Sequence, residues 1–290
     1  MSKRVLITGA NTGIGKATAT ALAHQGMQII LACKNPERAQ AARDEIVRET
    51  GNRAVDIAIV DLSSLQSVRT FAEDIHSRYD HLDVLINNAG ISLIDRTLSV
   101  DGNEMIFAVN HLGPFLLTNL LLDLLLAAEA ARIVNVASSV HKNARFDIND
   151  LQHERTWSGR NAYGCSKFMN VLFTYELARK LKDSKVTANC LCPGLVRSDF
   201  FRAYKKLPFM LKVVMKFVGR TPEEGARTSI YLASSEEVEG VSGRYFQNGK
   251  PVESSAGTYD PDLSANLWEQ SARLVAPPAE PPLVDRSALA

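Results

Sequence analysis

The sequence predicts a single doubly wound α/β domain, in which a parallel sheet of about seven strands is covered by helices on both faces. Three observations support this fold class. Short apolar runs alternate with helical patterns along the chain, as in strand–helix–strand units with right-handed crossovers. A glycine-rich segment directly follows the first apolar run. The composition, 46% hydrophobic and 22% charged, is typical of a globular protein with a large core.

The predicted elements follow one another without an internal repeat. We expect strands at residues 5–8, 28–33, 55–60, 84–87, 132–137 and 186–191. We expect helices at residues 16–25, 36–50, about 64–79, about 160–182, and in a long stretch that begins near 103 and includes the apolar run 116–128. Asn35 as N-cap, Pro36 as first residue and Gly51 after the last residue indicate the ends of the second helix.

The domain is expected to span residues 1–275, and residues 276–290 are predicted to be a disordered tail. The tail contains four of the eleven prolines and has no apolar periodicity. A proline-rich ligand for a partner protein is the alternative.

Charge and cysteine content exclude several classes of protein. The chain has 33 Lys and Arg against 32 Asp and Glu, a net charge of +1, so no overall field attracts nucleic acid or an anionic membrane. Four cysteines in 290 residues are too few for a disulfide scaffold, which indicates a reducing compartment, and their spacing does not match a metal site. The apolar run 5–7 is too short for a signal peptide, and 116–128 is shorter than the ~20 residues that span a bilayer. We therefore expect a cytoplasmic protein.

The glycine-rich segment at residues 8–16, TGANTGIGK, predicts a phosphate-binding turn. It joins a predicted strand to a predicted helix, so its backbone can approach a pyrophosphate at the positive end of the helix. An ordinary tight turn is the alternative, but the place at the first strand–helix junction favours a dinucleotide. The candidate contacts are Gly9, Asn11, Thr12, Gly13, Ile14 and Gly15.

The glycine spacing resembles that of the short-chain dehydrogenase/reductase superfamily, whose domain is a Rossmann fold. Further motifs of this family follow in the same order, over about residues 3–250. They are Asp61-Leu62, Asn87-Asn88-Ala89-Gly90, Asn110, Ser138-Ser139, Tyr163-Gly164-Cys165-Ser166-Lys167 and Pro193-Gly194-Leu195-Val196-Arg197-Ser198. The ordered set is far more specific than any one motif.

The resemblance implies a nicotinamide dinucleotide as cofactor. Beyond the glycine loop, the implied contacts are Asp61, Leu62, Asn88, Ala89, Gly90, Tyr163, Lys167, Pro193, Gly194, Val196 and Ser198. No metal is implied.

Lys34, at the end of the second predicted strand, predicts NADP(H) rather than NAD(H). An NAD site usually places an acidic residue about 20 residues after the glycines, where it accepts from the ribose 2′-OH. Here the first acid is Glu37, already inside the next helix. Lys34 supplies a cation for a 2′-phosphate instead, and a solvated surface lysine is the alternative.

Tyr163 and Lys167 are predicted to be the catalytic pair. Four residues apart in a helix, they project from one face. A free tyrosine, with a pKa of about 10, is a poor base at neutral pH, but a neighbouring ammonium favours the phenolate. The resemblance implies that Tyr163 exchanges a proton with the substrate oxygen, while Lys167 lowers the pKa of Tyr163 and holds the nicotinamide ribose.

Ser139 is predicted to donate a hydrogen bond to the substrate oxygen. Ser138 is the competing candidate, and capping of the strand end is the alternative role for either serine. His111 and His141 lie close by in the sequence, but we assign them no catalytic role because Tyr163 fills it.

Asn110 is the remaining predicted catalytic residue. Pro114, four residues later, has no N–H, so the helix cannot form the bond back to the Asn110 carbonyl and is expected to kink. The resemblance implies that this carbonyl holds a water in a proton relay to Lys167. A kink that serves packing alone is the alternative.

Several stretches resemble the retinol dehydrogenase group of the superfamily. They are residues 10–15, Leu31-Ala32-Cys33-Lys34, Asn110-His111-Leu112-Gly113, Ser138-Ser139-Val140-His141 and Asn170-Val171-Leu172-Phe173. The resemblance implies NADP(H) and apolar carbonyl substrates, such as retinaldehyde or other lipid-derived aldehydes and ketones. Several members carry an amino-terminal membrane anchor, which we do not expect here. The alternative function is a cofactor-binding regulatory protein without turnover, against which the intact catalytic set argues.

Residues 199–220 are predicted to form a lid over the substrate. Residues 200–218 combine aromatic and basic side chains, so peripheral contact with a membrane through a basic amphipathic helix is the alternative. The resemblance also implies a homodimer that pairs the 116–128 helix and the helix carrying Tyr163, although some relatives are monomers.

Overall fold

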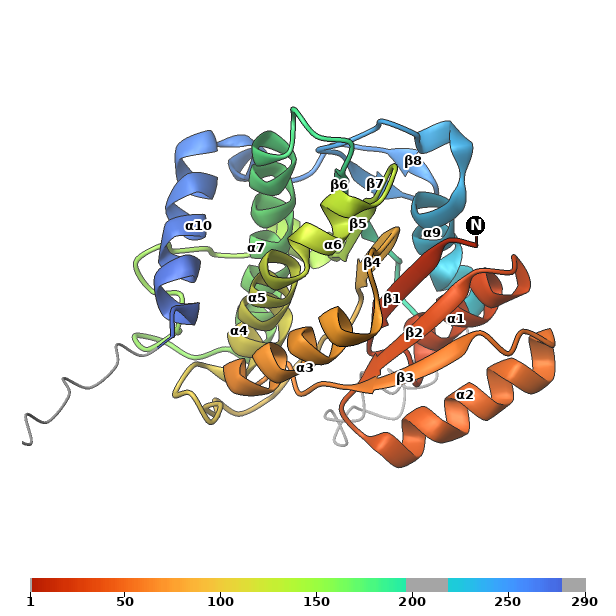
Figure 1. Cartoon of the computed structure of the whole chain (residues 1–290). Coiled ribbons are helices and arrows are strands. Elements are labelled where there is room, and N and C mark those ends of the chain that lie inside the picture. The colour runs from red at the N-terminus through yellow and green to blue at the C-terminus, as the bar shows by residue number, and fades with distance from the viewer. Residues whose placement is uncertain (1, 197–218, 278–290) are drawn as a thin grey trace, which may run out of the picture.

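The computed structural model describes residues 2–196 and 219–277, which form a single sheet with helices on both faces (Figure 1). Within these residues the sheet has eight strands in the order β3-β2-β1-β4-β5-β6-β7-β8, and only β7 and β8 pair antiparallel. The strands are β1 (Arg4–Thr8), β2 (Gln28–Cys33), β3 (Val55–Ile59), β4 (Val84–Asn87), β5 (Arg132–Val136), β6 (Thr187–Cys192), β7 (Tyr245–Gln247) and β8 (Lys250–Pro251). The predicted doubly wound α/β fold is confirmed.

The helices divide between the two faces of the sheet. They are α1 (Gly13–His24), α2 (Pro36–Thr50), α3 (Leu65–Arg78), α4 (Met105–Phe107), α5 (Gly113–Leu120), α6 (Leu122–Ala127), α7 (Gly159–Lys180), α9 (Pro222–Ser234) and α10 (Pro261–Val275). Short helical turns lie at Ala108–Leu112, Ser139–Asn143, Glu236–Val238 and Ala256–Tyr259. Helices α1, α2 and α9 cover one face, and α3, α5 and α7 cover the other, with α10 outside α7 (Figure 1).

Successive side chains of β1 point to opposite faces of the sheet and pack into two different hydrophobic cores. Val5 and Ile7 pack with the α1, α2 and α9 side, whereas Leu6 packs with the α3, α5 and α7 side. All three side chains are fully buried. A central strand of a parallel sheet is buried on both faces, so it is apolar at consecutive positions.

Helix α2 ends where the sequence predicts. The Asn35 Oδ1 atom accepts from the Arg38 N–H at 2.8 Å, and Gly51 closes the helix with φ +72°. Helix α1, by contrast, begins at Gly13, three residues before the predicted start. The glycine loop continues directly into the first helical turn.

The predicted long helix from 103 is interrupted. Glu104 caps the short helix α4 by accepting from the Ile106 and Phe107 N–H groups, each at 2.8 Å. A π-helical turn at Ala108–Leu112 follows, and α5 then begins with Pro114 as its second residue. The proline lacks the N–H that an α-helical bond to residue 110 requires, so the interruption lies around Asn110, as predicted.

Helix α10 lies across α5 and α7. The Trp268 ring packs 4.9 Å from the Phe115 ring and 5.7 Å from the Phe173 ring, centroid to centroid, and Leu267 is buried. These are two of the helices through which the resemblance implies a homodimer, so α10 covers part of that face within the chain. No helix in the described part of the chain is long and apolar enough to cross a membrane.

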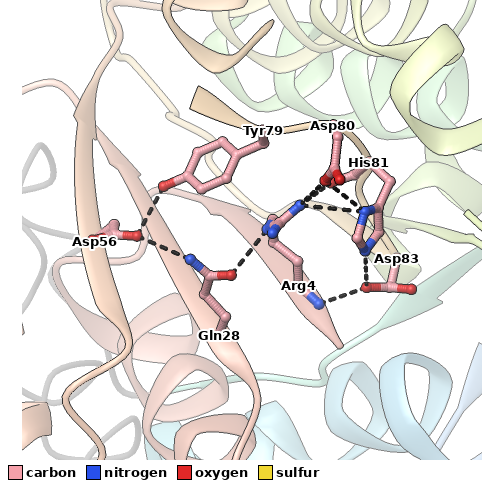
Figure 2. Close-up of polar contacts among 7 residues, drawn as sticks. All are labelled: Arg4, Gln28, Asp56, Tyr79, Asp80, His81 and Asp83. Atoms are coloured by element: carbon pink, nitrogen blue, oxygen red, sulfur yellow. Dashed lines mark hydrogen bonds and ion pairs between the residues drawn. The ribbon is translucent and has the colours of Figure 1, made fainter. Parts of the chain in front are cut away.

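A polar network joins the amino ends of the first strands (Figure 2). From β1, Arg4 donates through Nε to Gln28 Oε1 of β2 at 2.9 Å and through Nη1 to the His81 carbonyl at 2.8 Å. Gln28 donates to Asp56 Oδ2 of β3 at 3.2 Å, and Asp83, just before β4, accepts from the Arg4 N–H. The network therefore links β3, β2, β1 and the residue before β4 at the edge of the sheet away from the glycine loop.

Replacing Arg4 with Met is expected to lower the free energy of unfolding by ~1–3 kcal/mol, because it leaves several partly buried acceptors without their charged donor. Thermal unfolding measures the loss as a drop in Tm of a few degrees. Arg53→Met, at an exposed position before β3, is the matched control. An Arg4 variant as stable as this control would contradict the prediction.

Candidate active site

The glycine loop between β1 and α1 requires glycine at specific positions. Gly9 and Gly13 have φ of +66° and +55°, a region that disfavours other residues. A Cβ on Gly15 would collide with the Gly9 carbonyl and lie 2.5 Å from Asn88 Nδ2. Glycine therefore lets the loop pack closely against Asn88 at the start of α1, the end of a helix that favours anions.

A cavity of about 680 Å³ opens beside this loop, at the carboxyl ends of the strands. Many predicted cofactor contacts line it together: Gly9, Asn11, Thr12, Gly13, Ile14, Gly15, Lys34, Asp61, Leu62, Asn88, Ala89 and Gly90. A larger hollow of about 900 Å³ lies at the amino ends of the strands, beside Lys3, His81 and Glu239, and none of the predicted site residues lines it. In parallel α/β sheets the carboxyl edge is the ligand-binding edge, so the smaller cavity is the candidate site.

Asn88 joins the segment after β4 to the glycine loop. Its Nδ2 donates to the Thr8 carbonyl at 2.8 Å, and the Thr8 hydroxyl accepts from the N–H groups of Asn88 and Ala89 at 3.0 Å each. These bonds cross between β1 and β4, which pair in parallel. The predicted contacts on the two segments are thus held at fixed positions relative to each other.

Lys34 and Asp61 form an ion pair at one end of the cavity, with 2.7 Å between Nζ and Oδ2. Burial raises the pKa of the Asp61 carboxyl, but hydrogen bonds from Lys34 and Ser63 outweigh it and lower the pKa overall. Lys34 is 71% exposed and therefore accessible to a ligand. Arg38, which also lines the cavity, was missed by the sequence analysis, although a cation four residues after Lys34 in the first turn of α2 was a usable signal.

Helix α7 carries Tyr163 and Lys167. Lys167 Nζ donates to the Val136 carbonyl at the end of β5, at 2.8 Å, and lies 5.7 Å from the centre of the Tyr163 ring. The lysine is only 3% exposed, and burial lowers its pKa to about 8. The predicted pair is therefore adjacent, with the ammonium group near the ring of the tyrosine.

The Asn110 side chain joins the π-helical turn to the rest of the site. Its Oδ1 accepts from the Ile91 N–H at 2.8 Å, and its Nδ2 donates to the Ile91 carbonyl and to Ser166 Oγ, each at 2.9 Å. A Cβ on Gly90 would lie 3.4 Å from both Asn110 Oδ1 and Lys167 Nζ. The sequence analysis considered only the Asn110 carbonyl, whereas the amide also fixes the segment after β4 against α7.

The two serines after β5 have different surroundings. Ser138 Oγ accepts from the Val140 N–H at 3.5 Å and caps the short helix that follows, which is the structural role considered for either serine. The Ser139 residue is exposed, and its N–H donates to Cys192 Sγ at 3.2 Å.

The described part of the segment after β6 does not line this cavity, although it contains the predicted contacts Pro193, Gly194 and Val196. Pro193 and Gly194 follow Cys192 directly, and Gly194 has φ +83°. Val196 reaches the glycine-loop side, because a Cβ on Gly225 of α9 would lie 2.5 Å from Val196 Cγ2 and 3.3 Å from Ile14 Cγ1. Ser198 and the proposed membrane segment at 200–218 lie outside the described residues, as does the predicted lid at 199–220 except for residues 219 and 220.

The sequence matches a known protein family over most of its length. The family model described as short chain dehydrogenase matches residues 3–207. Human retinol dehydrogenases 14 and 13 are each 43% identical, over 94% of this chain and 86% and 84% of theirs.

Two solved structures show the same fold with high coverage. An uncharacterized protein from Mycobacterium Paratuberculosis has a TM-score of 0.75 and 34% identity, over 94% of this chain and 93% of that one. A protein from Shigella flexneri described as a short chain dehydrogenase complexed with NADP has a TM-score of 0.68 and 25% identity, over 86% and 97%. The chain therefore belongs to the short-chain dehydrogenase family of oxidoreductases and is related to the retinol dehydrogenases.

Proposed function

We propose that the protein transfers a hydride between NADP(H) and an apolar aldehyde or ketone, or the matching alcohol. The observation that carries the proposal is the placement of Tyr163 and Lys167 one helical turn apart on α7. Asn110 bonds both to Ser166 of this helix and to Ile91, which lines the cavity. The related retinol dehydrogenases support the reaction class.

The residues around the cavity fit a dinucleotide. A Cβ on Gly9 would lie 3.0 Å from Ala89 Cα, so this part of the loop has no room for a side chain and leaves its backbone to the ligand. We assign the pyrophosphate to the start of α1, the adenine to Asp61 and Leu62, and the nicotinamide end to the residues near α7 and β6. Those last contacts are Asn88, Ala89, Gly90, Tyr163, Lys167, Pro193, Gly194, Val196 and Ser198.

The bound cofactor supplies or accepts the hydride, and the side chains of this chain move the proton. During reduction the Tyr163 hydroxyl gives its proton to the substrate oxygen while the carbonyl carbon receives the hydride; oxidation reverses both transfers. The Lys167 ammonium favours the phenolate form of Tyr163. Ser139 donates a hydrogen bond to the substrate oxygen as negative charge develops there.

Exposed apolar side chains on the segments of the site support an apolar substrate. Val140 follows Ser139 and is 36% exposed, and Leu195 follows Gly194 and is 47% exposed. Ile94, after β4, is also exposed, and its carbonyl accepts from the Trp157 indole N–H at 2.8 Å. Side chains of this kind favour lipid-derived carbonyls over sugars.

An activity screen tests the proposed function. The protein is incubated with NADPH and a panel of retinoid, long-chain and short polar aldehydes, and NADPH oxidation is followed. We expect turnover with the apolar members and little with the polar ones. Cofactor binding without turnover on any member would instead support a regulatory binding protein.

Lys34 and Arg38 favour NADP(H) over NAD(H), because both cations line the same end of the cavity. Lys34→Ala and Arg38→Ala are each expected to lower kcat/KM for NADPH by about 10-fold. This corresponds to the lower end of the free-energy range of a charge-assisted hydrogen bond, because solvent weakens such bonds at exposed groups. The value for NADH should change little. Arg48→Ala, on an exposed position near the other end of α2, is the control. A wild-type preference for NADH would contradict the assignment.

A further inference from the structure

We propose that Cys192 and His141 are positioning residues that hold the peptide plane joining Ser138 to Ser139, and that they act in the reaction through Ser139. This inference rests on the proposed function, because it assumes that Ser139 bonds to the substrate oxygen. Neither residue needs to touch the substrate or the cofactor.

The two residues hold opposite atoms of the same peptide group. The Ser139 N–H donates to Cys192 Sγ at 3.2 Å, and the Ser138 carbonyl is 2.6 Å from His141 Nδ1. Any rotation of this peptide plane stretches one of these two contacts. Since the plane directly precedes the Ser139 Cα, it sets the direction in which the serine side chain leaves the backbone.

The tautomer of His141 follows from its second contact. The Ser255 N–H can only donate, and it lies 3.1 Å from His141 Nε2, so Nε2 is the acceptor. The ring proton is therefore on Nδ1, where it is donated to the Ser138 carbonyl. The ring is buried and packs edge-on against Tyr245 of β7, with 5.0 Å between centroids. His141 therefore connects the segment of Ser138 and Ser139, here called the serine segment, to the sheet.

Cys192 joins the segments that follow β5 and β6. The last backbone hydrogen bond between these strands runs from the Ala137 N–H to the Leu191 carbonyl, at 2.8 Å. Beyond it, β5 leads into the serine segment and β6 leads into the turn at Gly194. Cys192 Sγ accepts from both segments, because the Gly194 N–H is 3.4 Å away. The thiol is only 1% exposed, so no bulk water competes for these amides. One sulfur atom thus fixes the distance between the predicted substrate serine and a predicted cofactor turn.

Substitutions on β6 provide a matched test. Cys192→Ala removes the acceptor, Cys192→Ser keeps a smaller acceptor, and Cys190→Ala removes the same atom two residues earlier on the same face, where it does not contact the serine segment. We expect Cys192→Ala to lower kcat by about 10-fold, since small misplacements of a reacting group have effects of this order. Cys192→Ser should recover most of this loss, and Cys190→Ala should leave kcat unchanged. KM for the carbonyl substrate should change less than kcat in the Cys192→Ala variant.

A double-mutant cycle shows whether Cys192 acts through Ser139. Cys192→Ala is made in the wild type and in the Ser139→Ala variant, and NADPH affinity is measured by fluorescence in each. We expect little further loss of kcat in the Ser139→Ala background. A loss of the same size in both backgrounds, or equal kcat for Cys192→Ala and Cys190→Ala, overturns the inference while the proposed function stands. A wild-type protein without turnover overturns the proposed function, and the inference falls with it.

His141 gives an independent variant if Cys192→Ala does not fold. His141→Asn keeps an amide donor near the Nδ1 position for the Ser138 carbonyl, whereas His141→Phe keeps the ring packing against Tyr245 and loses both contacts. We expect the Phe variant to lose kcat by about 10-fold and the Asn variant to retain more of it. Wild-type kcat in His141→Phe overturns the role of this histidine.

Discussion

Tyr163→Phe is expected to lower kcat by about 10²–10⁴-fold, the usual contribution of a general acid or base. The substitution removes only the hydroxyl oxygen, so the ring next to the Lys167 ammonium remains in place. The Ser139 hydroxyl does not replace the lost proton donor, because a serine hydroxyl is a far weaker acid than a tyrosine phenol.

The measurement is the single-turnover rate of NADPH oxidation with an apolar aldehyde, together with NADPH affinity. Affinity should stay within a few-fold of wild type, since most of the proposed cofactor contacts are elsewhere. Tyr231→Phe, at a half-buried tyrosine on α9 whose hydroxyl donates to Glu237, is the control and should leave the rate unchanged. More than a tenth of the wild-type rate in Tyr163→Phe would exclude Tyr163 as the proton donor.

Lys167→Met is expected to have opposite effects on activity and stability. Loss of the ammonium raises the pKa of Tyr163 and removes a proposed ribose contact, so kcat should fall at least 100-fold, within the range of general acid–base catalysis. Stability should rise, because burial of the charged lysine is costly and lowers its pKa from 10.5 to about 8. At 1.36 kcal/mol per pKa unit, less the hydrogen bond to Val136, we expect a gain of about 1–3 kcal/mol at pH 7.

The sign of the pH dependence gives a second check on Lys167. The pKa is lower in the folded chain than in the unfolded one, so the cost of the buried charge is fully present below about pH 8. It decreases as the pH rises from there toward 10.5. The difference in Tm between Lys167→Met and wild type should therefore be largest at pH 7 and smaller at pH 9.5. Lys182→Met, an exposed lysine just after α7, should show neither effect, and a less stable Lys167→Met variant would contradict the prediction.

Local sequence patterns predicted the parts of the fold that depend on neighbouring residues. The cap, proline and glycine of α2 gave both ends of that helix, and the glycine loop fell at the first strand–helix junction. The sequence did not reveal β7, because three residues are too few for a pattern. Pro114 predicted the interruption around Asn110 but not its form, since neither the proline nor apolar periodicity distinguishes a π-helical turn from another kind of kink.

Motifs in the sequence indicated the candidate site residues one by one, but they did not indicate the contacts that support those residues. The sequence analysis gave His111 and His141 no catalytic role. In the structure both are buried, and His111 Nε2 lies 2.8 Å from Ser271 Oγ of α10. These two residues are 160 positions apart in the sequence, so their contact depends on how the helical layer packs and not on a local sequence pattern. For the same reason the pattern of the sequence did not indicate that a cysteine at the end of β6 would accept from the serine segment.

The short antiparallel strand β8 has a consequence for solubility. An open sheet edge with free N–H groups invites pairing with the same edge of another molecule. Here the outermost strand contains only Lys250 and Pro251, both exposed. Proline offers no N–H and a lysine charge repels its copy on a second molecule. This end of the sheet therefore resists edge-to-edge aggregation, although the sheet is not closed into a barrel.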